Sequence, residues 1–326
     1  MKVLLYTGGF HPVMPVKEAE TLGLKVTERD GRLVVGTADE WSKLKRLGYA
    51  HLLLEWLGEF DLGEDLPFDA GSVIEGSVAA RFKKHNFDGD FRGAKQEILH
   101  KLDPYMEDVD LQDPDTVLYF FIGNEKIYAG RLLHKFDPKP FQQRRNEVRP
   151  FSRPVSLPQR ESRCWINLSK ISEGGKLLDP FCGTGGVLIE SSLLDLDTYG
   201  SDADIEMVEG CRINLDYFNL EAELKRCTVQ SLSRSWEKKF DAIVTDPPYG
   251  IASKVGGERI EELYRVSLRE FEKVLKKGKR CVIGAPKRLD FEYIVGESKT
   301  SFRIVEKFEE QVHGSLTREI FVLEKD

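Results

Sequence analysis

Apolar and polar positions follow two different periods along the chain, and the changes between them predict the order of helices and strands. Within residues 1–60, short apolar runs bounded by turn residues predict strands at 2–6, 24–28, 33–36 and 51–57. Helical spacing predicts helices at 15–22 and 41–47, the second after the capping box Thr37-x-x-Glu40. The resulting order, β-α-β-β-α-β, predicts a ferredoxin-like domain over residues 1–60.

A second small α/β domain is predicted over residues 61–138. Its elements are a strand near 73–78, a helix near 93–102, and a hairpin of 117–122 with 126–133 across Gly123-Asn124. Prolines then recur between Pro138 and Pro158, so residues 139–156 are predicted to form an extended, basic linker.

The C-terminal part, residues 157–326, alternates buried strands with helices. An apolar strand pattern at 176–180 runs into Phe181-Cys182-Gly183-Thr184-Gly185-Gly186, and a helical pattern follows at 187–194. Further strands are predicted at 198–201, 240–245, 302–311 and 319–323. Glycines after a first buried strand allow the backbone to approach a bound cofactor, so this order indicates a cofactor-binding α/β sheet.

The glycine-rich loop does not decide which cofactor binds. Its spacing, Gly183-x-Gly185-Gly186, lacks the third glycine of G-x-G-x-x-G, and the sequence contains no G-x-x-x-x-G-K-[ST] motif. Asp202 follows the next strand, where a carboxylate binds the two hydroxyls of a ribose, and Asp204 is an alternative for that role. A nicotinamide dinucleotide is an alternative ligand on this pattern.

The segment Asp246-Pro247-Pro248-Tyr249-Gly250 suits the binding of a planar amino group. The lone pair of a nucleobase amine is delocalised into the ring, and acceptors placed on its N–H groups localise that pair for attack on a methyl group. The carboxylate of Asp246 and the carbonyl of Pro247 are predicted to be these acceptors, and Tyr249 offers a ring for stacking. The alternative is a strand that ends in a turn, since all these dipeptides favour turns.

Composition bounds the class of protein. A chain of 326 residues with 40% hydrophobic positions suits two or three globular domains. It has no apolar run near the roughly 18 residues of a membrane span, and its first apolar run is too short for a signal peptide. The five cysteines form no C-x-x-C pair and no cluster with histidine, so we expect buried thiols, no metal site and a cytoplasmic location.

Positive charge is concentrated in two places despite a formal net charge of −7. Between Arg131 and Arg153, seven Lys or Arg residues stand against two acids, and a second group between Arg81 and Lys101 is interleaved with phenylalanines. Cations near aromatic rings suit the binding of phosphates with base or sugar contacts, and a solvated linker and helix face are the alternative. The predicted RNA-binding residues are Arg81, Lys83, Lys84, Arg92, Lys95, Lys135, Arg144, Arg145 and Arg149.

Together, D-P-F-C-G-T-G-G at 179–186 and D-P-P-Y-G at 246–250 resemble the motifs of class I S-adenosylmethionine-dependent methyltransferases that act on exocyclic amino groups. The resemblance implies an α/β fold over 157–326, with a Rossmann-like seven-stranded sheet that ends in an antiparallel hairpin. Where the family often has an aspartate that contacts the adenine, this chain has Gln230. The implied catalytic residues are Asp246, Pro247 and Tyr249, and the implied cofactor-binding residues are Asp179, Phe181, Gly183, Gly185, Asp202, Gln230 and Asp246.

Two further resemblances concern RNA. Val109-Asp110-Leu111-x-x-Pro114-Asp115 is similar to a segment of the THUMP domain, an RNA-binding module of tRNA-modifying enzymes, which we therefore expect at 61–138. Arg149-Pro150-Phe151-Ser152-Arg153-Pro154 is similar to the R-P-F-x-H-P segment of the archaeal and eukaryotic tRNA guanine-10 N2-methyltransferases, with Arg153 in place of the histidine.

These resemblances imply S-adenosylmethionine-dependent methylation of the N2 amino group of a guanine in tRNA, at position ten, with one or two methyl groups added. The implied partners are tRNA and, as for some relatives, a small zinc-binding activator protein. The alternatives are a THUMP methyltransferase for another tRNA guanine or for ribosomal RNA, and a catalytically silent RNA-binding subunit. DNA adenine methylation also uses D-P-P-Y, but the THUMP-like segment disfavours it.

Overall fold

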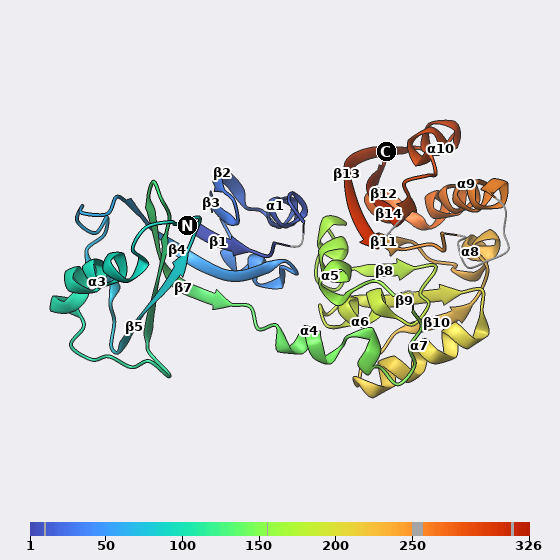
Figure 1. Ribbon diagram of the computed structural model, residues 1–326. Coiled ribbons are helices and arrows are strands. Elements are labelled where there is room, and N and C mark those ends of the chain that lie inside the picture. The colour runs from blue at the N-terminus through green and yellow to red at the C-terminus, as the bar shows by residue number, and fades with distance from the viewer. Residues whose placement is uncertain (10, 155, 250–256, 314–315) are drawn as a thin grey trace. The chain divides into compact units, whose positions relative to one another are not determined.

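The chain folds into two compact units in a computed structural model that describes residues 1–9, 11–154, 156–249, 257–313 and 316–326 (Figure 1). The first unit comprises Met1–Gly9, Gly23–Lys45 and Ala50–Asp137. The second comprises Phe10–Leu22, Arg46–Tyr49 and Pro138–Asp326. Within the described ranges, no helix is long and apolar enough to cross a membrane.

The first unit is built on one mixed sheet. Among the described residues its strands lie in the order β2-β3-β1-β4-β7-β6-β5, and neighbours are antiparallel except for the parallel pair β5 and β6. Its elements are β1 (Lys2–Thr7), β2 (Lys25–Asp30), β3 (Leu33–Thr37), β4 (Ala50–Phe60), α2 (Ala70–Val73), β5 (Val78–Lys84), α3 (Phe91–Leu102), β6 (Thr116–Ile122) and β7 (Ile127–Lys135).

The order β2-β3-β1-β4 is that of the predicted ferredoxin-like unit, with the 3-10 helix η1 (Trp41–Arg46) where a second α-helix was expected. The predicted domain boundary at residue 60 is corrected by the pairing of β4 with β7. This pairing runs from Leu52 opposite Lys135 to Phe60 opposite Ile127. Residues 1–60 and 61–138 therefore contribute to one continuous sheet.

The predicted strand at 73–78 is wrong in its bounds. Residues Ala70–Val73 form α2, whose first turn is capped by Asp69. β5 begins only at Val78. Between them Gly76 adopts a φ of +64°, which breaks an extended run, and Asp115 accepts a hydrogen bond from the Ser77 N–H at 2.9 Å. Helix α3 and the hairpin of β6 and β7 confirm the other predicted elements of this segment.

The second unit contains the predicted Rossmann-like sheet. In the described part of the chain its seven strands follow the order β10-β9-β8-β11-β12-β14-β13. The first five are parallel, and β14 is antiparallel to both of its neighbours, which confirms the terminal hairpin. The strands are β8 (Lys176–Asp179), β9 (Asp197–Asp202), β10 (Glu223–Arg226), β11 (Phe240–Thr245), β12 (Leu275–Pro286), β13 (Phe302–His313) and β14 (Leu316–Lys325).

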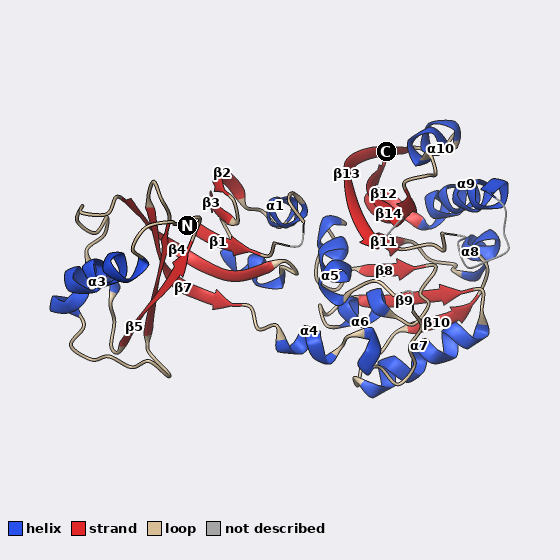
Figure 2. Ribbon diagram, in the orientation of Figure 1, coloured by secondary structure: helices blue, strands red, loops and turns tan. Residues whose placement is uncertain are grey.

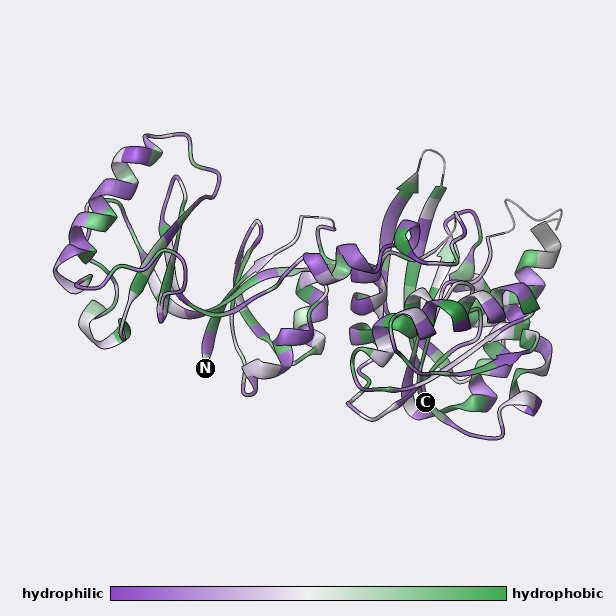
Figure 3. Cartoon of the chain, turned by 90° about the horizontal axis from the view of Figure 1, so that it is seen from below, coloured by the Kyte–Doolittle hydropathy of each residue, from purple (hydrophilic) through white to green (hydrophobic). Residues whose placement is uncertain are grey.

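Helices cover both faces of this second sheet (Figure 2). Successive residues of β11 point to opposite faces, so that Val244 joins a cluster with Trp165 while Ile243 joins one with Phe271. Figure 3 shows the hydrophobic stretches along the strands of both sheets. The helices are α5 (Gln159–Leu168), α6 (Gly186–Ser192), α7 (Ile205–Tyr217), α8 (Leu232–Ser235), α9 (Gly257–Val274) and α10 (Phe291–Glu297).

Two short N-terminal segments belong to the second unit, so residues 157–326 do not make up the whole of it. Helix α1 (Met14–Thr21) packs against α5, and Met14 and Tyr49 lie in the same buried cluster as Trp165. The fully buried carboxylate of Glu18 accepts hydrogen bonds from the Gly48 N–H at 2.7 Å and from Asn167 at 2.6 Å. These segments complete the core and the polar interior of the second unit.

The predicted linker is folded onto the second unit instead of being extended. It contains α4 (Lys139–Gln143) and a 3-10 turn, η3 (Asn146–Val148). Further on, Asn214 of α7 accepts a hydrogen bond from the Phe151 N–H at 2.9 Å and donates to its carbonyl at 2.7 Å. A Cβ at Gly210 would stand 2.1 Å from the Phe151 ring, so α7 receives this ring where it has no side chain.

Candidate active site

The glycine-rich loop joins the end of β8 to the start of α6. Gly183 and Gly185 have φ values of +48° and +87°, a region that other residues rarely adopt. A Cβ at Gly185 would also lie 2.7 Å from the sulfur of Cys211, so this position has no space for a side chain. The loop therefore presents backbone at the carboxyl end of the sheet, where α/β proteins bind ligands.

Asp179 anchors the base of this loop. Its buried carboxylate accepts hydrogen bonds from the Thr245 hydroxyl at 2.7 Å and from the Phe181 N–H at 3.1 Å. Burial raises its pKa to about 7, against the hydrogen bonds from Thr245 and Phe181. The bond from Thr245 ties the end of β11 to the end of β8, and this places Asp246 next to the loop.

Asp202 and Asp204 are distinguished by their hydrogen bonds. Asp202, at the end of β9, accepts the Gly183 N–H at 3.0 Å and the Asp204 N–H at 3.0 Å. Asp204 instead caps α7 by accepting the Glu206 N–H at 2.9 Å. Burial raises the pKa of Asp202, and its carboxylate lies beside the loop, so it is the better placed of the two for a ribose. Gln230 is exposed in the 3-10 helix η4 (Val229–Ser231) after β10.

Asp246 follows directly on β11, and both of its carboxylate oxygens have partners. The Tyr249 hydroxyl donates to Oδ1, and Nη1 of Arg318 donates to Oδ2 at 3.0 Å. Burial, then the charge of Asp246, raises the pKa of Tyr249, so this hydroxyl keeps its proton. Arg288 donates to the Tyr249 carbonyl at 2.6 Å, which holds the turn at that end. The predicted trio Asp246, Pro247 and Tyr249 is thus brought together, with Pro247 buried.

Sequence reasoning missed the residues that surround Asp246. Arg318 of β14 is 4% exposed and also donates to Glu161 of α5 and Glu310 of β13. Gly284 of β12 faces the same place, because a Cβ there would stand 2.2 Å from Oδ1 of Asp246. An arginine directly before the predicted strand at 319–323 was the available signal, since an unpaired buried charge is costly.

The cations predicted to bind RNA fall into two environments. In the first unit, Lys83, Lys84 and Lys95 lie over the rings of Tyr6, Phe91 and Phe82 at 5.6, 5.5 and 5.4 Å. Lys84, Lys95, Arg92 and Lys135 are exposed, and Arg81 donates to the carbonyl of Leu111 at 2.6 Å. These residues stay candidates for phosphate contacts.

Two linker arginines are corrected. Arg144 makes a two-pronged ion pair with the fully buried Glu190, at 2.8 and 3.2 Å. Arg149 is 4% exposed and donates to the Arg144 carbonyl at 3.0 Å and to the Ser156 hydroxyl at 3.3 Å. Their guanidinium groups are used inside the second unit, so neither is placed to contact RNA. Arg145 is exposed, and Arg153 pairs with Glu206 of α7.

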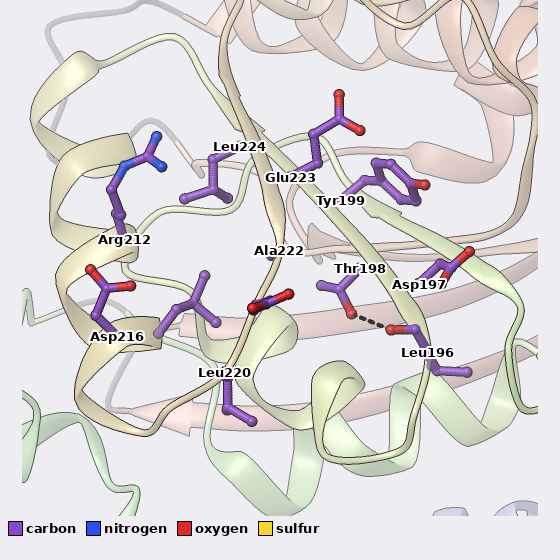
Figure 4. A pocket seen from close by; sticks show the side chains of 12 residues that line it. Leu196, Asp197, Thr198, Tyr199, Arg212, Asp216, Leu220, Ala222, Glu223 and Leu224 are labelled. Carbon is purple, nitrogen blue, oxygen red and sulfur yellow. Dashed lines mark hydrogen bonds between the residues drawn. The ribbon is translucent and has the colours of Figure 1, made fainter.

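A solvent-open hollow of about 620 Å³ lies elsewhere on the second unit (Figure 4). Leu196 to Tyr199, at the amino end of β9, form one wall, and side chains of α7 and β10 form the others. Asp202 and the glycine-rich loop are at the opposite end of the same strand. The hollow is therefore separate from the candidate active site.

Comparison with known proteins places the chain in a family. Residues 146–320 match the model of the RMKL-like methyltransferase domain. The chain is 34% identical to the tRNA (guanine(10)-N2)-dimethyltransferase of Methanothermobacter thermautotrophicus, with 100% of both chains covered, and 33% identical to that of Pyrococcus abyssi, with 94% and 93% covered. TrmN from Thermus thermophilus has the same fold, with a TM-score of 0.57 at 19% identity over 100% of both chains. The chain therefore belongs to the family of the tRNA (guanine(10)-N2)-dimethyltransferases.

Proposed function

We propose that the protein transfers methyl groups from S-adenosyl-L-methionine to the exocyclic N2 amino group of guanine 10 in tRNA, adding one and then a second. The observation that carries the proposal is the position of Asp246. Its carboxylate lies at the end of β11, and the Thr245–Asp179 hydrogen bond links that point to the glycine-rich loop. An acceptor for an amine and a loop suited to a nucleoside cofactor thus meet at one edge of the sheet.

The residues of this edge fit S-adenosyl-L-methionine. Gly183 and Gly185 adopt the positive φ values of the loop, and Asp202 offers a carboxylate to ribose hydroxyls beside them. Asp179 adds a carboxyl group at the base of the loop. A carboxyl group at this position favours a cationic ligand. When bound, the cofactor supplies a methyl group on a sulfonium, an electrophile that an amine can attack.

Asp246 and Pro247 prepare the guanine amine for that attack. Asp246 accepts one N–H and the Pro247 carbonyl accepts the other, which draws the amine out of conjugation with the ring. Proline fixes φ near −65°, so the carbonyl is held in one direction. As the new N–C bond formed and the C–S bond of the sulfonium broke, positive charge would develop on the nitrogen, and Asp246 would stabilise it and take the proton that leaves. For the second methyl group only one N–H remains, and Asp246 is the acceptor that it needs.

The first unit supplies the surface proposed to hold tRNA, with its THUMP-like segment at residues 61–138. Its exposed cations over aromatic rings suit a phosphate backbone, and Lys135 extends this set. Arg145, in the second unit, is a separate candidate. A tRNA substrate also implies a cytoplasmic location. The resemblance implies a small zinc-binding protein as a further partner of the methyltransferase unit, and turnover is to be compared with and without it.

Nucleoside analysis of a tRNA transcript treated with the protein and the cofactor tests the proposal. We expect N2-methylguanosine and N2,N2-dimethylguanosine in a transcript with guanine 10, and neither in a matched transcript with adenine 10. Asp246→Ala should lower methyl transfer by on the order of 10² or more, because it removes a positioned charge, with little change in tRNA affinity. Methylation of both transcripts would reassign the target position. Absence of methyl transfer, with cofactor and tRNA both bound, would leave an RNA-binding subunit.

A further inference from the structure

We infer that Arg318 is a positioning residue that fixes the carboxylate of Asp246 and leaves Oδ1 as the oxygen offered to the guanine amine; this rests on the proposed function. Arg318 is 4% exposed, and its guanidinium reaches Asp246 from β14, two strands away from β11 in the sheet. It contacts no part of the glycine-rich loop in the described hydrogen bonds. Its action on the reaction therefore goes through Asp246.

A glycine in the strand between leaves room for the carboxylate that Arg318 binds. β12 separates β11 from β14, and its residue Gly284 lies where these side chains converge. A Cβ there would stand 2.2 Å from Oδ1 of Asp246 and 2.9 Å from both the Trp165 ring and the Tyr249 hydroxyl. Glycine at this position leaves the space in which Asp246, Tyr249 and Trp165 meet.

Other groups hold Arg318 in place from the opposite side. Glu310 stands opposite Arg318 in the β13–β14 ladder and accepts from Nη2 at 2.6 Å, and Glu161 of α5 accepts from the same nitrogen. The Trp165 ring lies 5.1 Å from the guanidinium carbon. These contacts come from α5 and β13, so the guanidinium is fixed independently of Asp246. Preorganisation of this kind is what a positioning residue requires.

The two glutamates that hold Arg318 have pKa values shifted in opposite directions. Burial raises the pKa of Glu161 well above its usual range, so this carboxyl is neutral. Burial also opposes the ionised form of Glu310, but the hydrogen bond from Glu161 and the charge of Arg318 outweigh it and lower its pKa. Arg318 thus lies between Glu310 on one side and Asp246 on the other, within ion-pair distance of both.

The two oxygens of Asp246 consequently have different roles. Oδ2 is bound by a buried guanidinium that is itself fixed by two carboxyl groups. Oδ1 is bound by the hydroxyl of Tyr249, a residue that is only partly buried in the turn at the end of β11. The amine of guanine takes over the position of that hydroxyl at Oδ1, while the contact at Oδ2 persists through the reaction.

Single-turnover methyl transfer to tRNA, measured for Arg318→Gln and Arg318→Lys, tests the role. We expect Arg318→Gln to lower the rate constant by about 10- to 10²-fold, the scale of a small misplacement of a reacting group, with unchanged affinities for cofactor and tRNA. Arg318→Lys keeps the charge without the fixed geometry and should recover part of the loss. Arg280→Gln is the matched control, because Arg280 also ties β14 to its neighbour, through Glu324 at 3.0 Å, away from Asp246.

If Arg318 had only a structural role, Arg318→Gln and Arg318→Lys would both be less stable than the wild type and would have the same single-turnover rate constant. That result would overturn the inference. A double-mutant cycle with Asp246→Asn gives a second measurement. In the Arg318→Gln background Asp246→Asn should lower the rate far less than in the wild type, because the two residues act as one unit. Additive losses would also overturn the inference. A wild-type protein without methyl transfer would overturn the proposed function itself, and unfolding measurements on the same cycle would then report whether Arg318 and Asp246 are coupled at all.

Discussion

Cations are placed in opposite environments in the two units. In the first unit Lys84 and Lys95 are exposed beside aromatic rings, and neither forms an ion pair with another described residue. In the second unit the buried Arg318 and the partly buried Arg144 and Arg163 pair with carboxylates, and Glu190, the partner of the latter two, is fully buried. A run of basic residues in a sequence therefore does not indicate a single structural role. Exposed cations are available to a polyanion, and buried ones have become part of the fold.

The largest effect expected from this comparison is on stability. Removal of both partners of Glu190, as Arg144→Ala with Arg163→Ala, leaves a buried carboxylate without a cation and should lower the free energy of unfolding by about 3 to 5 kcal/mol. Urea-induced unfolding followed by tryptophan fluorescence measures this. Arg212→Ala is the control, because Arg212 and Glu209 form an exposed pair at 3.8 Å. A double variant as stable as the control would show that the second unit does not depend on these pairs.

A buried acid whose hydrogen bonds come from neutral donors should show the same contrast through pH. Glu18 is held by the N–H groups of Gly48 and Tyr49 and by Asn167, and burial raises its pKa to about 7. A raised carboxyl pKa gives stability that is complete below the unfolded value and is lost as the pH rises through about 7.

Glu18→Gln should therefore flatten the decrease in unfolding free energy between about pH 4.5 and 7. The decrease in unfolding free energy that Glu18→Gln removes has a limiting slope of about 1.4 kcal/mol per pH unit. Urea unfolding at several pH values checks this, with Glu20→Gln, an exposed partner of Lys17, as the control. An unchanged pH dependence in Glu18→Gln would assign the slope to other groups, of which Asp179 is one.

The exposed cations should act on binding and leave stability unchanged. Lys84→Gln and Lys95→Gln combined should weaken tRNA binding by roughly tenfold near physiological salt and reduce the slope of log Kd against log salt by about 2. Filter binding over a salt series measures both. The pair Lys25→Gln and Lys43→Gln is a matched control, since those lysines pair with Asp39 and Glu40. Equal losses in the two sets would mean that overall charge, and not this surface, binds tRNA.

The smallest effect is expected for the hydroxyl of Tyr249 in the second unit. Tyr249→Phe keeps the ring and removes the donor to Oδ1, so methyl transfer should fall by less than about tenfold, the scale of one hydrogen bond. Tyr249→Ala should lose more, because base stacking contributes roughly 1 to 3 kcal/mol. Single-turnover rates distinguish the two, with Tyr293→Phe on the surface of α10 as the control. If Phe were as damaging as Ala, the hydroxyl would be the working group.

Local pattern was sufficient for most of the second unit. The strand at 240–245 has the predicted bounds, and the glycine-rich loop and Asp246 follow their strands as expected. These elements are set by residues close together in the chain. The predicted boundaries at 60 and 157 were wrong because pairing of β4 with β7 and packing of α1 on α5 join residues far apart, and no local period reports such contacts.

The same distinction applies to the candidate site. Asp246 and Tyr249 stand in one short motif, whereas Glu161, Glu310 and Arg318 reach the site from three elements spread along the sequence. Arg149 and Lys95 are both basic residues near aromatic ones in sequence, yet one is buried and the other exposed. Burial was decided by Asn214 and Gly210 receiving the linker, which composition alone does not reveal.

The early segments of the second unit set the order in which the protein can be completed during synthesis. Glu18 leaves the ribosome 149 residues before Asn167, its hydrogen-bond partner. Until α5 has been translated, the apolar side of α1 has no cover from α5, whereas the last strand of the first unit is complete at Lys135. Translation thus completes the first unit while α1, which belongs to the second unit, still lacks its packing partner. A nascent chain stopped between these points carries an exposed helix that only further elongation, or a chaperone, can protect.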